Sequence, residues 1–310
     1  MLLIVSTNPT VDRTIDVPVL TPHRVHRSTK LQLSAGGKGL NVGRAAKTLG
    51  IPYLVAGFLG GASGQLLDRL TQAEGLKAAW IEFEGVETKM SHLLRHTQGD
   101  STVINEPGPA LTADQCARAD SFILDKAQAA RAVILAGSVP PGVEAADYLQ
   151  LCKNLQRRAH HVLVDTPGET LKAAITYPQG LALKVNSEEL SEAMHRPLEG
   201  LDDLKGAAQK LLDRGADLIC ITRGREGALA VEKNGAWLCS YELANPVSSV
   251  GSGDSFSAGL SLKWMRSLPL PEALRWASAC GAANAQTELP ARFSLESVKK
   301  LLPLIKVEKL

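Results

Sequence analysis

The chain carries one glycine-rich stretch that decides how the rest is interpreted, Val250-Gly251-Ser252-Gly253-Asp254-Ser255-Phe256. Glycines let the backbone turn tightly and bring its N–H groups close to a ligand. The pattern that follows, from Ser257 to Met265, predicts a helix. The unpaired N–H groups and positive dipole end of such a helix face the same place as the turn. Together these features are typical of a phosphate site.

Asp254 is the unusual member of this stretch, because a carboxylate beside a bound phosphate is repulsive. Two interpretations are open. Asp254 could act as the general base for a hydroxyl that attacks a phosphoryl group held by the turn. It could instead cap the helix, since aspartate is a preferred N-cap residue.

Composition excludes several classes of protein. A chain of 310 residues with 45% hydrophobic and 21% charged residues is ordinary for a globular protein. The net charge of +2 gives no reason to expect nucleic acid or an acidic membrane surface as a partner. The longest N-terminal apolar run, Leu2 to Val5, is too short for a signal peptide or a membrane span. Five scattered cysteines without a C-x-x-C pair argue against disulfides or zinc and favour a cytoplasmic location.

Apolar runs alternate along the chain with segments of helical period. Strands are expected within 2–5, 53–58, 132–136, 162–164, 181–183 and 218–221, and helices within 41–49, 63–73, 145–158, 187–194 and 201–214. This alternation predicts an α/β fold, a doubly wound and mainly parallel sheet with helices on both faces. In such sheets, ligands bind at the carboxyl ends of the strands.

Two segments near the start interrupt the alternation, at about 14–33 and 88–105. The first mixes polar and apolar residues without a helical period. The second predicts a hairpin, with strands at 91–95 and 102–104 and a turn over 97–100. We expect both to form a small β-sheet lid over the active site, although ordinary hairpin decoration would give the same pattern. No linker divides the sequence, so 1–310 is predicted to be a single domain with an inserted lid.

A second glycine-rich turn, Ser34 to Val42, also opens a predicted helix. Its spacing is not that of a Walker A loop. Nearer the N-terminus, Asp12 follows the first predicted strand, where a carboxylate could accept hydrogen bonds from sugar hydroxyls. Two such turns, far apart in the sequence, suggest two polar ligands brought face to face.

Six motifs together carry a resemblance to a known family. They are Asn8-Pro9-x-x-Asp12, Gly36-Gly37-Lys38-Gly39-x-Asn41-Val42, Gly137-Ser138-Val139-Pro140-Pro141-Gly142, Lys184-x-Asn186-x-x-Glu189, Thr222-x-Gly224-x-x-Gly227 and Gly251-Ser252-Gly253-Asp254-Ser255. In type and order they resemble those of ribokinase-like carbohydrate kinases, in the 1-phosphofructokinase and tagatose-6-phosphate kinase branch. The resemblance implies an ATP- and Mg²⁺-dependent kinase acting on a ketohexose monophosphate, with fructose 1-phosphate as the first candidate. It also favours the general-base interpretation of Asp254.

The same resemblance implies roles for individual residues. Asp254 would be the catalytic base, and the amides of Gly251, Ser252 and Gly253 would form an anion hole. Residues implied to bind the sugar phosphate are Asp12, Arg27, Gly37, Lys38, Asn41, Lys89 and Ser138. Residues implied to bind the nucleotide are Lys184, Thr222, Gly224, Gly227 and Asn284, while Asn186 and Glu189 would hold Mg²⁺ indirectly, through water.

One departure from the branch concerns the sugar site. The usual Arg-x-Asn at the start of the second lid segment is Lys89-Met90-Ser91 in this chain. Lysine supplies a charge but not a bidentate fork. Tagatose 6-phosphate, fructose 6-phosphate and a non-phosphorylated sugar or nucleoside therefore stay open as substrates. A sugar- or nucleotide-binding regulatory protein is the non-enzyme alternative, and exposed lid edges lead us to expect a homodimer through the lid.

Overall fold

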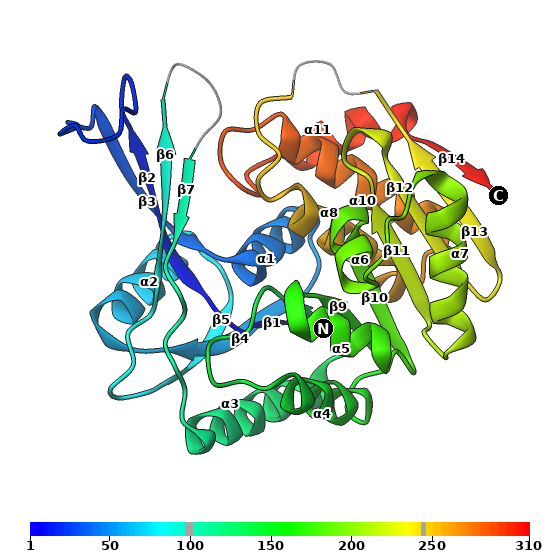
Figure 1. Ribbon diagram of the computed structural model, residues 1–310, viewed down its shortest axis with the longest axis horizontal. Helices are drawn as coiled ribbons and strands as arrows, with labels where there is room; N and C mark the ends of the chain where they lie inside the picture. The colour runs from blue at the N-terminus through cyan, green and yellow to red at the C-terminus, as the bar shows by residue number, and fades with distance from the viewer. Residues whose placement is uncertain (97–101, 243–245) are drawn as a thin grey trace.

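The computed structural model describes residues 1–96, 102–242 and 246–310. Within these residues, ten strands form a large sheet in the order β14-β13-β12-β11-β10-β9-β8-β1-β4-β5. Four further strands of the described chain form a small sheet in the order β3-β2-β6-β7. Figure 1 shows the small sheet standing to one side of the main body, with α1 between the two.

The large sheet is parallel over most of its width. Its strands are β1 (Leu2–Ser6), β4 (Tyr53–Leu59), β5 (Ala78–Glu82), β8 (Ala132–Ala136), β9 (His161–Asp165), β10 (Leu181–Asn186), β11 (Leu218–Thr222), β12 (Ala228–Glu232), β13 (Gly235–Ser240) and β14 (Lys306–Lys309). Neighbours from β5 to β11 run parallel, and β11 to β14 pair antiparallel. The predicted mainly parallel sheet is confirmed. The sequence did not reveal β5, β12, β13 and β14. β13 and β14 lack a continuous apolar run, whereas β12 is a buried apolar run, Ala228 to Val231, that follows β11 after only a short connection.

Helices cover both faces of the large sheet, as predicted. They are α1 (Lys38–Thr48), α2 (Gly61–Ala73), α3 (Ala113–Lys126), α4 (Ala145–Gln156), α5 (Gly168–Thr176), α6 (Ser187–Ala193), α7 (Gly200–Asp213), α8 (Ser252–Leu260), α9 (Leu262–Met265), α10 (Leu270–Ala285) and α11 (Leu295–Leu301). Alternate residues of β1 face opposite ways: Leu2 and Ile4 pack in one core cluster, and Leu3 and Val5 in the other. The first cluster includes residues of α1, α8 and α10, and the second includes residues of α4, α5 and α7.

One helix boundary differs from the prediction in a way that matters for the site. α8 begins at Ser252 and not at Ser257, so Asp254 lies in the first helical turn and not in a preceding loop. The cause is the close packing of α8 against α10, which buries the stretch 254–260 and stabilises a helix despite its glycines. Among the described residues there is no helix with the length and apolar character that a membrane span requires.

The small sheet forms from the two segments that interrupt the alternation. Its strands are β2 (Thr10–Asp16), β3 (Lys30–Gly36), β6 (Met90–Arg95) and β7 (Thr102–Asn105). β6 and β7 pair antiparallel, as the predicted hairpin requires, while its turn at 97–100 lies outside the described residues. The predicted range 14–33 was wrong at both ends, because β2 follows β1 after only the residues 7–9. Asp12 therefore belongs to the small sheet.

Leu135 in β8 is fully buried, whereas Leu304 near the C-terminus is 59% exposed. Leu135→Ala removes methyl groups from the core and leaves a cavity, so we expect the free energy of unfolding to fall by about 2–5 kcal/mol. Leu304→Ala, the matched control, should change it by less than about 0.5 kcal/mol. Urea unfolding followed by circular dichroism measures both values, and equal losses in the two variants would contradict the assigned core.

Candidate active site

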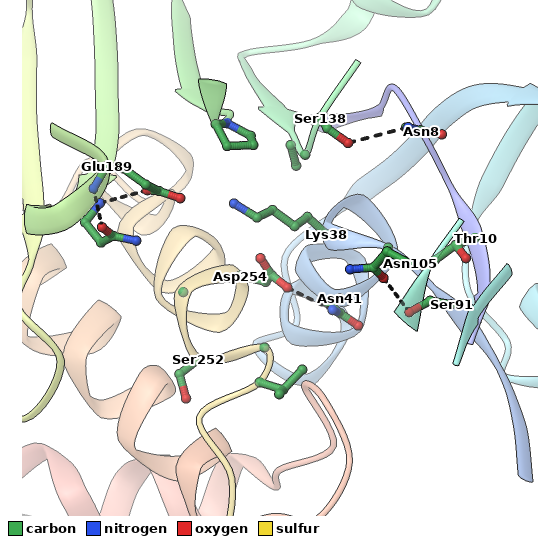
Figure 2. A pocket seen from close by; sticks show the side chains of 18 of the residues that line it. Asn8, Thr10, Lys38, Asn41, Ser91, Asn105, Ser138, Glu189, Ser252 and Asp254 are labelled. Atoms are coloured by element: carbon green, nitrogen blue, oxygen red, sulfur yellow. Dashed lines mark hydrogen bonds between the residues drawn. The ribbon is translucent and has the colours of Figure 1, made fainter. Parts of the chain in front are cut away.

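A pocket of about 1090 Å³ is lined both by the small sheet and by the carboxyl ends of parallel strands of the large sheet. This is the position expected for ligands in open α/β sheets. Figure 2 shows Lys38 and Asp254 in the middle of the pocket, with Glu189 on one side and Ser91 and Asn105 on the other.

Asp254 does not cap its helix. The N-cap of α8 is Gly251, whose φ of 83° is left-handed, and no side chain caps this end. The side chain of Asp254 is buried, and its Oδ2 accepts a hydrogen bond from Asn41 Nδ2 at 2.8 Å. The capping interpretation is therefore wrong, and the carboxylate is directed at the pocket that it lines.

The surroundings of Asp254 raise its affinity for a proton. Burial raises the pKa of Asp254, and the negative charge of Asp165 raises it further. The charges of Lys38 and Lys184 and the hydrogen bond from Asn41 oppose this rise. A carboxylate whose pKa is raised accepts a proton more readily, which suits a general base.

A buried ion-pair cluster lies beside Asp254, and its centre is Asp165 at the end of β9. Asp165 Oδ1 accepts from Lys38 Nζ at 3.1 Å and from Lys184 Nζ at 3.3 Å, and Oδ2 accepts from Ser257 Oγ at 2.7 Å. Burial alone would raise the pKa of Asp165, but the two lysines and Ser257 lower it to about 2. Asp165 is therefore ionised and holds both ammonium groups at the pocket wall. Asp165 was not predicted from the sequence. Its position directly after the apolar run 162–164, at the carboxyl end of a predicted strand, could have indicated a site residue.

The predicted anion hole lies at the first turn of α8. Gly253 admits a close neighbour, because a Cβ there would lie 2.8 Å from Lys184 Nζ. The amide of Ser252 donates to Ser249 O at 3.1 Å, so in this structure it is engaged within the turn. Gly251, Ser252 and Gly253 all line the pocket. Their function as anion-hole donors stays a prediction.

Asn284 lies behind this turn. Its Nδ2 donates to Val250 O and to Ser252 Oγ, both at 2.9 Å, and its Oδ1 accepts from Ala291 N at 2.6 Å. It is fully buried and is not part of the pocket lining that the described residues form. The amide nitrogen of Asn284 thus supports the glycine turn, and its oxygen holds the chain at Ala291. Its contact with the nucleotide stays a prediction.

Sugar-side residues come from the small sheet. The strand register places Asp12 opposite Ser91 and Ser91 opposite Asn105, and all three line the pocket. Ser91 Oγ donates to Asn105 Oδ1 at 2.7 Å (Figure 2). Lys89, just before β6, lines the pocket beside them. Asn105 was not singled out from the sequence, and only the exact register of the hairpin would have revealed it.

Asp12 is close to its titration point at neutral pH. Burial raises the pKa of Asp12 to about 7, and the charges of Asp254 and Glu74 also raise it. Arg44 and Lys89 oppose the rise. The balance between these charges therefore decides whether a carboxylate is available to accept hydrogen bonds from a ligand.

The second glycine-rich turn joins the small sheet to α1. Gly37 is the N-cap of α1, with a φ of 95°, and it lines the pocket together with Asn41 one turn later. A Cβ on Gly36 would overlap the carboxyl group of Asp12. The turn thereby brings Asp12 and Asn41 toward the same part of the pocket.

Two predicted sugar-phosphate contacts differ in their outcome. Arg27 is exposed on the connection 17–29 and takes no part in the pocket lining formed by the described residues, so its contact with a sugar phosphate stays a prediction. Ser138 does line the pocket, and its Oγ accepts from Asn8 Nδ2 at 3.4 Å. Arg27 was selected as a cation at the end of the first predicted lid segment, and neither its charge nor that position determines where the side chain of a long connection lies.

The predicted nucleotide side lies at the ends of β10 and β11. Thr222, Gly224 and Gly227 all line the pocket, as does Lys184. A Cβ on Gly227, whose φ is 90°, would overlap the carbonyl oxygen of Cys239, so glycine is required there. These positions are brought together as the sequence predicts, and nucleotide binding by them stays a prediction.

Asn186 and Glu189 also line the pocket, at the start of α6. They form a capping box: Glu189 N donates to Asn186 Oδ1 at 2.7 Å, and Asn186 N donates to Glu189 Oε2 at 3.1 Å. No three His, Cys, Asp or Glu side chains gather as a metal cage anywhere in the described parts of the chain. Oxygen atoms are the ligands that Mg²⁺ prefers, and this ion commonly keeps its waters and binds substrate phosphates. The residues present therefore fit a magnesium ion held indirectly.

Comparison with known proteins identifies the family. A model described as pfkB family carbohydrate kinase matches residues 5–297. The chain belongs to this family. The kinase is therefore a phosphotransferase with an alcohol group as acceptor, and its substrate class is sugars. The predicted superfamily and enzyme class are confirmed.

Solved structures agree with this assignment. Escherichia coli phosphofructokinase-2, in complex with potassium and in complex with fructose 6-phosphate, is 27% identical to the kinase, with TM-scores of 0.91 and 0.89. Each alignment covers 97% of this chain and 98% of the other. A Thermotoga maritima protein named a possible 1-phosphofructokinase is 24% identical over 100% of this chain and 99% of its own, with a TM-score of 0.86. At that identity the last comparison shows the fold alone.

Gly36→Ala tests the sugar side, because the added methyl group would displace the Asp12 carboxylate. We expect KM for the sugar to rise and kcat/KM to fall by about a hundredfold, since small misplacements near a substrate can cost that much. KM for ATP should change little. Gly206→Ala in α7 is the control, because a Cβ there meets no atom within 4 Å. Steady-state kinetics that leave the sugar KM of Gly36→Ala unchanged would remove Asp12 from the site.

Proposed function

We propose that this kinase uses ATP and Mg²⁺ to phosphorylate a primary hydroxyl of a ketohexose monophosphate, with fructose 1-phosphate as the preferred substrate. One observation carries the proposal: the buried carboxylate of Asp254 lines one pocket together with Asp12 on the small sheet and Glu189 on α6, which follows β10 of the large sheet. A sugar bound against Asp12 would bring its hydroxyl to a base, and phosphates would approach that hydroxyl from the side of Glu189.

In this mechanism, Asp254 accepts the proton of the sugar hydroxyl while the hydroxyl oxygen forms its bond to the γ-phosphorus. The bond between that phosphorus and the bridging oxygen of ADP breaks, and ADP leaves with the bonding electrons. Negative charge on the transferred group would face Lys38 and Lys184, which Asp165 fixes in place. Phosphoryl transfer depends mainly on such positioning and electrostatic stabilisation.

The sequence predicts that Lys38 binds the phosphate already on the sugar. We propose instead that Lys38 binds the phosphoryl group that is transferred. The charge of Asp165 raises the pKa of Lys38, and Asp254 and Glu189 add to this effect. Lys38 therefore stays charged and would stabilise the negative charge of the transferred phosphoryl group. Other residues would then bind the phosphate already on the sugar.

A magnesium ion bound with ATP would neutralise charge on the nucleotide phosphates. Asn186 and Glu189 would hold its waters, because their capping box fixes both side chains at the pocket wall. Thr222, Gly224 and Gly227 would contact the nucleotide beyond them.

Preference for a sugar phosphate rests on the small sheet. Among the described residues that line the pocket from this sheet and its connections, Lys89 is the one cation, and Ser91 and Asn105 add neutral polar groups. One lysine with neutral donors can bind a phosphate, and the motifs resemble the 1-phosphofructokinase branch. Fructose 6-phosphate is the second candidate, because it is bound by the 27% identical Escherichia coli phosphofructokinase-2.

We also propose that the chain is one domain in which the small sheet acts as a lid that excludes water during transfer. Its edge strands β3 and β7 carry exposed apolar side chains, namely Leu31, Val103 and Ile104. Exposed edges and apolar side chains favour association with a second copy. A homodimer through the two lids would cover them.

The substrate proposal is tested by ADP release with Mg-ATP and each of fructose 1-phosphate, fructose 6-phosphate, tagatose 6-phosphate, fructose, ribose and adenosine. We expect the highest kcat/KM with fructose 1-phosphate. Asp254→Asn should lower kcat by at least about a hundredfold, because general-base catalysis typically contributes 10²–10⁴. Its KM for ATP should be retained, and the exposed Asp114→Asn is the control.

Each result of this panel has a definite meaning. Preference for another ketohexose phosphate would overturn the choice of sugar and keep the mechanism. Activity on uncharged sugars alone would show that Lys89 does not bind a phosphate. If Asp254→Asn kept more than about a tenth of the activity, the general-base assignment would be wrong.

The lid-to-lid dimer is tested by sedimentation velocity at micromolar concentration. We expect the wild-type chain to sediment as a dimer and Ile104→Asp to sediment as a monomer, because a buried unpaired charge disrupts an apolar interface. Leu304→Asp, an equally exposed site outside the small sheet, should leave the dimer intact. A monomeric wild-type chain, or a dimer that both variants preserve, would contradict the proposed interface.

A further inference from the structure

A row of buried hydrogen bonds leads away from Asp254 beneath the sugar side of the pocket. Asn41 Nδ2 donates to Asp254 Oδ2 at 2.8 Å, and Asn41 Oδ1 accepts from Arg44 Nη1 at 2.7 Å. Arg44 in turn donates from Nε to Glu74 Oε2 at 2.5 Å and from Nη2 to Glu74 Oε1 at 3.1 Å. The Arg44 side chain is only 8% exposed. None of the roles assigned above uses this arginine.

Arg44 determines which end of the Asn41 amide faces Asp254. A guanidinium can only donate hydrogen bonds, so the group of Asn41 that contacts it has to be the oxygen. The amide nitrogen is then left to donate to the carboxylate. Asp254 and Arg44 thus hold the two ends of the amide, and without Arg44 the Asn41 oxygen would lose its buried donor and the amide would be held at one end only.

The same guanidinium ties α1 to the base of the small sheet. Arg44 Nη2 donates to Ala35 O, and Glu74 Oε1 accepts from Ala35 N at 3.2 Å. Ala35 pairs with Val11 in the adjacent strand, next to Asp12. Glu74 is also held from the far side by Arg292 at 3.0 Å. Arg44 and Glu74 therefore connect β3, the strand that pairs with the Asp12 strand β2, to the helix that carries Asn41.

Arg44 acts on Asp12 through charge as well. The charged groups that face Asp12 are Arg44 from α1, Lys89 from the connection before β6, Asp254 from α8 and Glu74 after α2. Burial raises the pKa of Asp12, Asp254 and Glu74 add to the rise, and Arg44 and Lys89 lower it. Removing the charge of Arg44 would therefore favour the protonated form of Asp12 at neutral pH.

Glu74 is ionised and keeps the guanidinium in place. Burial would raise the pKa of Glu74, but the hydrogen bonds and charge of Arg44, together with Arg292 and the Ala35 amide, lower it. A guanidinium and a carboxylate joined by two hydrogen bonds form a pair of fixed geometry.

We propose that Arg44, held by Glu74, is a positioning residue of this kinase: it orients Asn41 toward Asp254 and fixes α1 against β3, the strand that pairs with the Asp12 strand. The inference rests on the proposed function, in which Asp254 is the base and Asp12 binds the sugar. Arg44 is not part of the pocket lining formed by the described residues, so it acts through Asn41 and Asp12 and does not touch the substrate.

Two substitutions separate geometry from charge. Arg44→Lys keeps the positive charge but loses the fork, so we expect kcat/KM for the sugar to fall about ten- to a hundredfold with KM for ATP unchanged. The acid limb of its pH profile should stay in place. Arg44→Met loses the charge too, so the acid limb of kcat/KM should move to higher pH, because Asp12 then binds its proton more tightly.

Lys47→Met is the matched control. Lys47 is on the same helix and donates to the backbone oxygen of Glu74 at 2.7 Å, but it has no part in the row that reaches Asp254. It should behave as wild type. If either Arg44 variant does not fold, Glu74→Gln keeps the size of the partner and removes its charge. Because the guanidinium is then less firmly held, Glu74→Gln should raise KM for the sugar by a smaller factor, without changing KM for ATP. Its acid limb should move to lower pH, since the charge of Glu74 raises the pKa of Asp12.

The outcomes distinguish this inference from the function on which it rests. A purely structural arginine would lower the melting temperature and the fraction of active enzyme, but leave the sugar KM and the pH profile of the folded fraction unchanged. That result, with Asp254→Asn inactive, would overturn the positioning role and leave the proposed function intact. An active Asp254→Asn would overturn the proposed function and this inference together.

Discussion

Ionised groups that are removed from water have to be paired, and this requirement organises the centre of the molecule. Asp165 lies between Lys38 and Lys184, and the three groups come from β9, α1 and β10. Asp254 adds a second carboxylate from α8 within reach of their fields. No single element could carry these charges buried. These charges are paired only when β9, α1, β10 and α8 come together. The polar centre therefore forms only in the folded chain.

Small residues make this meeting possible. Gly36 leaves space for the carboxylate of Asp12, and Gly253 leaves space for the ammonium group of Lys184. A third position, Gly39 at the start of α1, lets the helix approach β1, since a Cβ there would lie 2.5 Å from the Cβ of Ser6. At each of these glycines, the space that a side chain would fill is occupied by a charged group or by a neighbouring strand. The positions of these glycines along the chain are set by the residues that they contact, which lie far away in the sequence.

Much of this arrangement could be predicted, and the part that could not has a common cause. The central strands, the two glycine turns and Asp254 are local features, because each is visible as an apolar run or a turn followed by a helix. Asp165, Asn284 and Arg44 depend on partners far along the chain, and a local pattern does not contain those partners. Asn284 was assigned to the nucleotide through the family resemblance, and its amide makes hydrogen bonds within the protein. The lid boundary at Thr10 was missed because so short a connection follows β1.

The position of β1 has a consequence for how a new chain acquires this fold. β1 is formed by residues 2–6, yet it pairs on one side with β4 and on the other with β8, which begins at Ala132. During synthesis, one hydrogen-bonding edge of this apolar strand therefore stays open until more than a hundred further residues have been made. An open apolar edge is a template for pairing with other chains. β1, which has a neighbour on both sides in the finished sheet, is thus a segment of the nascent protein that needs protection from such pairing.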